Sequence, residues 1–224
     1  MNKLPDNSID LVLADPPYGI SRKLNCKGKR IGTTAKLDFE FGEWDKFNKE
    51  WITLGMAKTR GWFMSFCAKK DIGIYWNALE KNDFRAIDVI VWQKPDPVPL
   101  NAKSRFLNAW EAIVVGKKDN AYWGSTYKHN ILKYQAPKNS DRVHPTQKPL
   151  GLIKELIELT TQPGDIVLDP FIGSGTTAIA CKQLKRKFIG FEISPEYFEM
   201  AQNRLEKTFK ISDKNTTLNS FLKD

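Results

Sequence analysis

Short apolar runs alternate with longer amphipathic stretches along most of the chain. Continuous apolar runs of a few residues are typical of buried strands, whereas a 3.6-residue repeat is typical of helices that bury one face. The runs predict strands at residues 9–14, 62–66, 87–92, 166–168 and 188–191. The amphipathic stretches predict helices at residues 50–57, 71–82, 149–161, 176–184 and 196–207. Because strands alternate with helices, we predict an α/β fold of the Rossmann-like kind, with a mostly parallel sheet flanked by helices.

Three segments interrupt this alternation. Residues 21–43 combine glycines with basic and polar residues, which predicts a long loop. Residues 94–143 are rich in turn-forming and aromatic residues around one apolar run at 112–115. The last residues are polar, and we expect 212–224 to form a frayed tail. No repeat divides the chain, so a single domain over residues 1–224 is expected.

The composition sets further bounds on the class of protein. The 224 residues suffice for one substantial core. No apolar run approaches the roughly 20 residues of a membrane-spanning helix, and the N-terminal residues contain no secretory signal. Cys26, Cys67 and Cys181 lie far apart, so neither a disulfide framework nor a zinc cluster is predicted. We therefore expect a soluble protein of the cytoplasm, with no membrane partner.

Basic residues outnumber acidic ones by 35 to 26, which gives a formal net charge of +9. Residues 21–38 hold six basic residues and one acidic residue, and residues 94–148 hold ten basic and four acidic residues. A localised basic surface is typical of proteins that bind nucleic acid. The same excess also fits ordinary solvated lysines, so charge alone leaves both interpretations open.

The first turn with chemical potential is Asp15-Pro16-Pro17-Tyr18, which directly follows an apolar strand. In open α/β sheets, ligands bind beyond the carboxyl ends of the strands. The carboxylate of Asp15 and the carbonyl of Pro16 can accept hydrogen bonds from an exocyclic amine, and the ring of Tyr18 can stack on a planar base. An ordinary strand-ending turn with an incidental tyrosine is the alternative.

The second turn is glycine-rich and covers residues 169–177, between a predicted strand and a predicted helix. Gly173, Gly175 and Ala178 fit a loose dinucleotide-binding pattern, and Glu192 ends the next strand, where a ribose acceptor would lie. No lysine follows the second glycine, so the turn is not a phosphate-binding P-loop. A nucleoside-type ligand is favoured, with nicotinamide nucleotides and S-adenosylmethionine as alternatives.

The third turn is His144-Pro145-Thr146-Gln147-Lys148-Pro149, just ahead of a predicted helix. The hydroxyl of Thr146 and the ammonium of Lys148 are suited to holding a carboxylate at the helix entrance. His144 also fits a surface or capping position. The other histidine, His129, is isolated in the sequence, so no metal site is predicted.

Taken in this order, the three turns and Gly190-Phe191-Glu192 resemble the amino-group DNA methyltransferases that modify adenine N6 or cytosine N4. The resemblance is to the permuted beta-class order, in which the catalytic turn precedes the cofactor turn. It covers nearly the whole chain, from Leu11 to Leu205. It implies the Rossmann-like fold of S-adenosylmethionine-dependent methyltransferases, in a prokaryotic or phage protein, and places a target-recognition segment at residues 94–143.

The resemblance also implies roles for individual residues. S-adenosylmethionine would be the cofactor, with Glu192 on its ribose hydroxyls, Thr146 and Lys148 at its methionine end, and His144 also in contact with it. The remaining cofactor contacts would be Asp169, Pro170, Phe171, Gly173, Gly175 and Thr176. The catalytic turn would comprise Asp15, Pro16, Pro17 and Tyr18, with the target amine bound by Asp15 and the Pro16 carbonyl and with the extruded base stacked on Tyr18.

Within this family, Asp-Pro-Pro-Tyr more often marks adenine-N6 enzymes, and a serine in the first position more often marks cytosine-N4 enzymes. The resemblance therefore favours adenine in a specific DNA sequence. The basic residues expected to contact DNA lie in the two basic segments: Lys27, Lys29, Arg30, Lys94, Lys103, Arg105, Lys128, Lys133 and Arg142.

Family members usually carry a strand and an acidic turn upstream of the catalytic strand, and only eight residues precede Ile9. We therefore expect that element to be missing or truncated. DNA is the expected partner, and a homodimer and a cognate restriction enzyme are compatible with the resemblance. The competing hypotheses are a cytosine-N4 or RNA methyltransferase, a catalytically silent DNA-binding subunit, and a nicotinamide oxidoreductase, which leaves the Asp15 turn unexplained.

Overall fold

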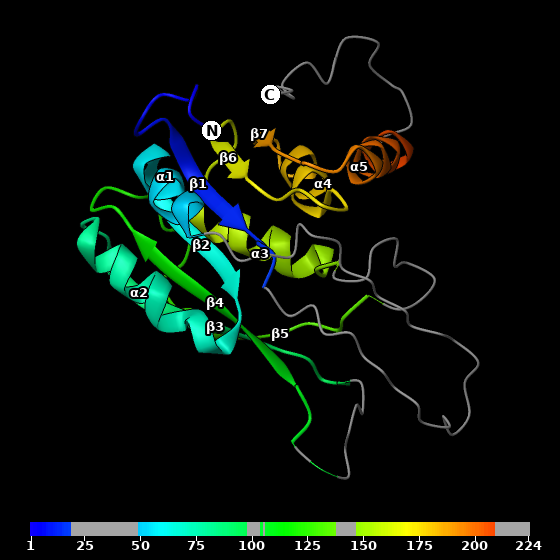
Figure 1. The fold of residues 1–224 in the computed structure, drawn as a ribbon, viewed down its shortest axis with the longest axis horizontal. Coiled ribbons are helices and arrows are strands. Elements are labelled where there is room, and N and C mark those ends of the chain that lie inside the picture. Colours follow the sequence, from blue (N-terminus) through cyan, green and yellow to red (C-terminus); the bar gives the residue numbers. More distant parts are fainter. Residues whose placement is uncertain (19–48, 98–103, 105, 138–146, 209–224) are drawn as a thin grey trace.

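One seven-stranded sheet organises the chain in the computed structural model, which describes residues 1–18, 49–97, 104, 106–137 and 147–208 (Figure 1). The strand order is β5-β3-β4-β2-β1-β6-β7. The strands are β1 (Ile9–Ala14), β2 (Thr59–Cys67), β3 (Arg85–Gln93), β4 (Trp110–Lys117), β5 (Ile131–Lys133), β6 (Ile166–Asp169) and β7 (Lys187–Gly190). The helices are α1 (Glu50–Lys58), α2 (Ile72–Lys81), α3 (Leu150–Thr160), α4 (Thr176–Gln183) and α5 (Pro195–Thr208), with a 3₁₀ turn at Lys69–Asp71.

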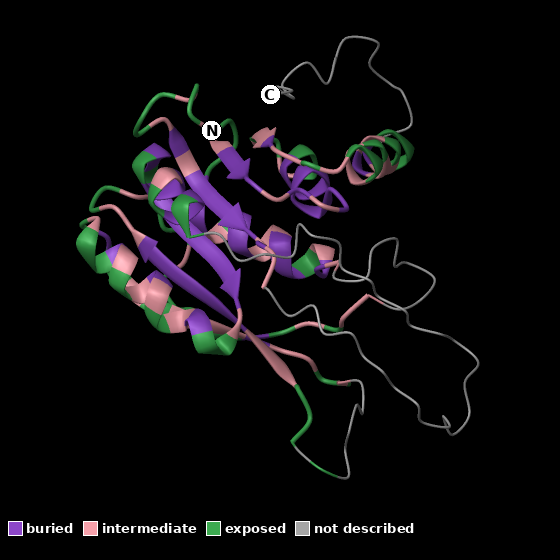
Figure 2. Cartoon of the chain, in the orientation of Figure 1, coloured by how far each residue is buried: buried purple, intermediate pink, exposed green. Residues whose placement is uncertain are grey.

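The sheet is buried on both faces. Successive residues of a strand point to opposite faces, so Leu11 and Leu13 of β1 join the cluster beneath α3 and α4, whereas Val12 and Ala14 join the cluster beneath α1 and α2. All four are at most 2% exposed. The central strands are therefore buried along most of their length, as Figure 2 shows for β1 and β2. The fifth helix, α5, packs on α4 at the end of the sheet where β7 lies.

The predicted α/β fold is confirmed, with one difference in strand direction. β1–β2, β1–β6, β6–β7 and β3–β5 are parallel pairs, whereas β4 is antiparallel to both β2 and β3. The apolar run at 112–115, which the sequence placed inside a turn-rich segment, forms the middle of β4. Part of the expected target-recognition segment therefore belongs to the core. Within the described residues, every helix is too short or too polar to cross a lipid bilayer.

The strand directions decide which residues meet. β1, β2, β3 and β6 all end at one edge of the sheet, and the reversed strand β4 begins there. A helix that connects parallel strands runs back across the sheet, so α3 and α4 also begin at this edge. Residues directly after β1, β3 and β6 and residues at the start of β4 and α3 are consequently gathered on one side of the molecule.

A glycine permits the close pairing of β1 with β2. The register of this pair shifts between Ile9 and Leu11, where Gly61 faces the backbone of Asp10. A Cβ atom added to Gly61 would lie 2.0 Å from the Asp10 carbonyl oxygen, a distance that neither backbone can accommodate. The two central strands therefore pair closely only with glycine at this position.

We predict that Gly61→Ala lowers the free energy of unfolding by about 3 kcal/mol, because the added methyl forces two central strands apart. Gly73→Ala is the matched control, since Gly73 is exposed in α2 and a Cβ there meets nothing within 4 Å. That substitution should raise the free energy of unfolding by about 0.5–1 kcal/mol through helix propensity. Urea denaturation measures both changes, and equal stabilities of the two variants would contradict the prediction.

Candidate active site

The Asp15 turn begins where β1 ends, at the edge of the sheet described above. Its two prolines follow at once, and Pro16 is buried. The Tyr18 hydroxyl donates a hydrogen bond to Asp15 Oδ1 at 2.9 Å. The Lys148 ammonium donates another to Asp15 Oδ2 at 2.6 Å. Both oxygens of the carboxylate are thus engaged, one by its own turn and one by a residue 133 positions away.

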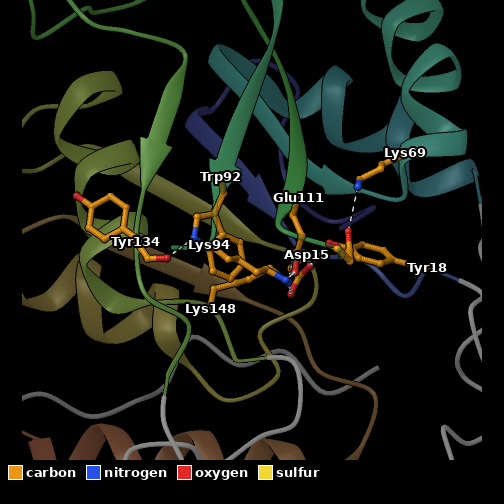
Figure 3. A network of polar contacts seen from close by, with 9 residues as sticks. Asp15, Tyr18, Lys69, Trp92, Lys94, Glu111, Tyr134 and Lys148 are labelled. Carbon is orange, nitrogen blue, oxygen red and sulfur yellow. Dashed lines mark hydrogen bonds and ion pairs between the residues drawn. The ribbon is translucent and has the colours of Figure 1, made fainter. Parts of the chain in front are cut away.

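Lys148 lies just ahead of α3 and lines the same site (Figure 3). Its side chain is only 8% exposed. Besides Asp15, its Nζ lies 3.4 Å from Glu111 Oε2 and 4.8 Å from the centre of the Phe66 ring. The ring of Tyr18 is 5.6 Å away. The ammonium is therefore enclosed by two carboxylates and two aromatic rings.

Glu111 and Lys94 complete the network of ion pairs around Asp15 and Lys148. The sequence predicted neither residue in this network. Glu111 is the second residue of β4, and its Oε1 accepts a hydrogen bond from Lys94 Nζ at 2.5 Å. Lys94 follows β3, and its Nζ also lies 4.8 Å from the Trp92 ring. No local motif marks Glu111, because only the reversal of β4 brings it to the edge where the other strands end.

Burial and charge pairing set the ionisation of these groups. Burial raises the pKa of Asp15 despite the opposing ammonium of Lys148. Burial works against the charge on Lys148, yet the nearby carboxylates of Asp15 and Glu111 raise its pKa. Burial likewise opposes the charge on Glu111, but Lys148 and Lys94 lower its pKa. Two carboxylates and two ammonium groups therefore balance one another in a site largely shielded from water.

The glycine-rich turn follows β6, the strand next to β1. Asp169 ends β6 and is 4% exposed, so it faces the inside of the turn. Its Oδ1 accepts a hydrogen bond from the Phe171 N–H at 2.9 Å, and the Thr177 hydroxyl also donates to its carboxylate. Burial raises the pKa of Asp169 to about 7. These contacts indicate that Asp169 supports the turn from beneath, and its direct contact with the cofactor stays a prediction.

Two glycines shape the rim of this turn. Gly173 has φ +47° and Gly175 has φ +78°, a left-handed region that L residues with side chains rarely adopt. At Gly175 an added Cβ would lie 3.1 Å from the Ala201 Cβ of α5, whereas at Gly173 the nearest atom beyond the adjoining residues would be the Phe171 carbonyl oxygen, 3.9 Å away. The first glycine therefore leaves open space beside the backbone, and the second permits close packing of α5.

Glu192 faces this rim from beyond the end of β7. Its Oε2 accepts a hydrogen bond from the Gly173 N–H at 3.0 Å, and its Oε1 accepts one from the Ser194 N–H at 2.9 Å. The turn and the acidic residue predicted to bind a ribose are thus in direct contact. Pro170 is buried in the same turn, and the Phe171 ring packs edge-on against Trp51 at 5.1 Å.

Arg204 of α5 is a second supporting residue that the sequence analysis missed. Its Nη1 donates hydrogen bonds to the Ser174 carbonyl at 2.9 Å and to the Thr176 hydroxyl at 3.0 Å. The Thr176 hydroxyl accepts one of these hydrogen bonds, and the contact of Thr176 with the cofactor stays a prediction. Arg204 lies on an ordinary amphipathic helix with no motif of its own, so only the packing of α5 on the turn reveals its function.

Several predicted site residues lie outside the described part of the chain. They are Lys27, Lys29, Arg30, Lys103, Arg105, Arg142, His144 and Thr146. Of the described lysines expected on DNA, Lys94 is paired with Glu111 and only 18% exposed, so its charge neutralises a carboxylate inside the site. Lys128 pairs with Glu155, and Lys133 is exposed on β5.

A carboxylate that can accept from an amine, next to a nucleoside-type turn on adjacent parallel strands, defines a methyltransferase-like site. A family model described as DNA methylase matches residues 9–203, and the chain belongs to this N6/N4 DNA methylase family. It is therefore an amino-group DNA methyltransferase, as the resemblance implied.

Individual relatives agree with this assignment. The Type II methyltransferase M2.MboI of Moraxella bovis is 34% identical, over 91% of this chain and 83% of that protein. M2.DpnII of Streptococcus pneumoniae is 31% identical, over 92% of this chain and 85% of that protein. The crystal structure of the complex of M1.HpyAVI with S-adenosylmethionine matches with a TM-score of 0.69 at 30% identity, covering 91% of this chain and 90% of that one. The cytosine-N4-specific PvuII methyltransferase shares the fold, with a TM-score of 0.68 at 19% identity over 96% and 84% of the two chains.

We predict that Asp169→Asn changes how stability depends on pH. The ordinary pKa of Asp169 is 3.8 and its folded value is about 7, so the folded state binds the proton more tightly. Relative to the non-titrating variant, the wild-type protein is therefore most stable below about pH 4. It loses about 4 kcal/mol of that relative stability as the pH rises to 7.

Urea denaturation of both proteins at a series of pH values measures this difference, and the titrations of all other groups cancel in the comparison. A stability difference that stayed constant between pH 4 and pH 8 would show that Asp169 is not held in its protonated form.

Proposed function

We propose that this protein transfers a methyl group from S-adenosylmethionine to the exocyclic N6 amine of adenine in a specific DNA sequence. The observation that carries the proposal is the position of Asp15 and the glycine-rich turn, which follow the adjacent parallel strands β1 and β6. A base held at Asp15 and a nucleoside cofactor held at the turn would lie beside each other. Such proximity is a large part of what an enzyme contributes to group transfer.

The geometry of the turn suits this cofactor. Gly173 leaves open space beside its backbone, and the Glu192 carboxylate stands next to it, fixed by two backbone N–H groups. A carboxylate in that position can accept hydrogen bonds from ribose hydroxyls. Glu192, Phe171, Gly173 and Gly175 would hold the nucleoside, and Lys148 with Thr146 would bind the methionine end.

When bound, S-adenosylmethionine supplies a methyl group activated by a sulfonium. The remaining chemistry belongs to residues of the protein. An aromatic amine delocalises its lone pair into the ring, and acceptors on its two hydrogens draw the nitrogen toward tetrahedral geometry. Asp15 and the Pro16 carbonyl would be these acceptors. The methylated nitrogen must then lose a proton, and the raised pKa of Asp15 suits its carboxylate to receive it.

Tyr18 would hold the target base while Asp15 orients its amine. Extruding a base from the duplex costs a few kcal/mol of stacking and pairing, and an aromatic platform recovers part of it. Tyr18 can serve as that platform because its hydroxyl is fixed to Asp15 Oδ1, which ties the ring to the carboxylate. Its pKa is raised well above the ordinary value by burial and by Asp15, so the phenol keeps its proton.

The test is methyl transfer from labelled S-adenosylmethionine to unmethylated genomic DNA, followed by nucleoside analysis. We predict N6-methyladenine, and a loss of at least about 100-fold in rate for Asp15→Ala with the cofactor affinity largely retained. Asp119→Asn is the control, because Asp119 is exposed and only loosely paired with Arg85, at 3.7 Å. N4-methylcytosine as the product would overturn the base assignment, and full activity of Asp15→Ala would overturn the function of that residue.

We predict that binding to DNA weakens steeply with salt, because the two basic segments would displace counterions from phosphates. With six or more phosphate contacts, the affinity should fall by about 10³-fold or more between 50 mM and 200 mM salt. Fluorescence anisotropy with a labelled duplex measures this slope. A flat response would show that the net charge of +9 is not used on the DNA backbone.

A further inference from the structure

The hydrogen bonds of Asp15 raise a problem for the proposed reaction. A carboxylate oxygen can accept two hydrogen bonds, but the target amine must approach Asp15 beside Tyr18, which already donates to Oδ1, and Lys148, which already donates to Oδ2. The Tyr18 contact lies within the same short turn. The Lys148 contact comes from another element, so Lys148 is the partner that can withdraw without unfolding the turn.

Withdrawal of Lys148 toward solvent would be costly. The side chain is 8% exposed, and the Phe66 and Tyr18 rings stand beside its ammonium. A buried ammonium that loses its carboxylate keeps the cost of burial without the compensating attraction. Lys148 therefore needs a second carboxylate within a short movement of its present position.

Glu111 provides that carboxylate. Its Oε2 lies 3.4 Å from Lys148 Nζ, compared with 2.6 Å for Asp15 Oδ2. This oxygen is buried and makes no hydrogen bond to any described residue, whereas Oε1 is held by Lys94. Lys94 thus fixes the carboxylate at one oxygen and leaves the other directed at Lys148. A movement of about 0.8 Å, the difference between these two distances, would give the ammonium as short a contact with Glu111 as it now has with Asp15.

We propose that Glu111 is a positioning residue that takes over the Lys148 ammonium when the target amine displaces it from Asp15. The inference rests on the proposed function and names a device within the same site. Charge balance is preserved throughout, because the two carboxylates and two ammonium groups stay together and the entering amine is neutral. An ammonium has three donors, so pairing with Glu111 is compatible with a contact from Lys148 to the cofactor.

The primary experiment measures the single-turnover rate of methyl transfer for Glu111→Gln with saturating S-adenosylmethionine and DNA. We expect a fall of at least about tenfold, with the dissociation constant for S-adenosylmethionine changed by less than about twofold. Glu155→Gln is the matched control: Glu155 is equally shielded, at 21% exposed against 19% for Glu111, and also pairs with a lysine, but on α3. It should retain the wild-type rate.

A double-mutant cycle tests whether Glu111 acts through Lys148. In the Lys148→Met background the ammonium is absent, so adding Glu111→Gln should cause no further loss beyond about twofold. Independent, multiplicative losses would overturn the proposal. Glu111→Asp serves as a second variant that keeps the charge, and it should retain more of the rate than Glu111→Gln; equal losses in both would also contradict it.

The pH profile separates this role from a merely structural one. The titratable groups around Asp15 are Tyr18 from its own turn, Lys148 from just before α3, Glu111 from β4, Asp169 from the end of β6 and Tyr75 from α2. The charge on Glu111 raises the pKa of Asp15, and Lys148 lowers it. Removing Glu111 should therefore move the acidic limb of the rate profile to lower pH while the plateau falls. A lower plateau with an unmoved limb would indicate general damage to the site.

The wild-type protein is measured first in the same assay. A wild-type protein that methylates no adenine would overturn the proposed function. An active wild-type protein whose Glu111→Gln variant is equally fast would overturn only the function of Glu111.

Discussion

The buried ammonium of Lys148, placed between the carboxylates of Asp15 and Glu111, is the interaction on which the architecture of the active site depends. Charges removed from water are tolerated only when they are paired, and breaking such a pair leaves a strongly unfavourable group behind. Here the four members of the network come from the turn after β1, the segment after β3, the start of β4 and the segment before α3. Their mutual pairing fixes the relative positions of four elements at one edge of the sheet.

In the glycine-rich turn, the residues placed to contact a nucleoside differ from the residues that support the backbone. Gly173 and Glu192 lie on the rim of the glycine-rich turn, where a nucleoside would bind. Asp169 holds the turn from beneath through the Phe171 N–H, and Arg204 holds it from the side through Ser174. A turn with two left-handed glycines has little stiffness of its own. Its shape is therefore maintained by buried hydrogen bonds from β6 and α5.

The same division applies to the catalytic turn. Asp15 and Tyr18 form the turn where the base would bind, whereas the Lys94 side chain contacts Glu111 and the Trp92 ring. A lysine that seemed suited to DNA phosphate is used to orient a carboxylate inside the protein. Burial, together with the Glu111 carboxylate, raises the pKa of Asp15 more than the adjacent Lys148 ammonium lowers it.

The sequence alone determined five of the seven strands, the five α-helices and the three turns, because these depend on local patterns. The apolar run of β1 predicts a buried strand. The Asp15 turn that follows can be recognised from its residue types without knowing where the strand lies in the sheet. The tertiary structure alone decided which distant residues meet those turns. Glu111 and Arg204 have no local signature, since their functions arise from the reversed direction of β4 and from the packing of α5 on the glycine-rich turn. Strand direction and helix packing are set by the burial of whole faces, which no short stretch of sequence specifies.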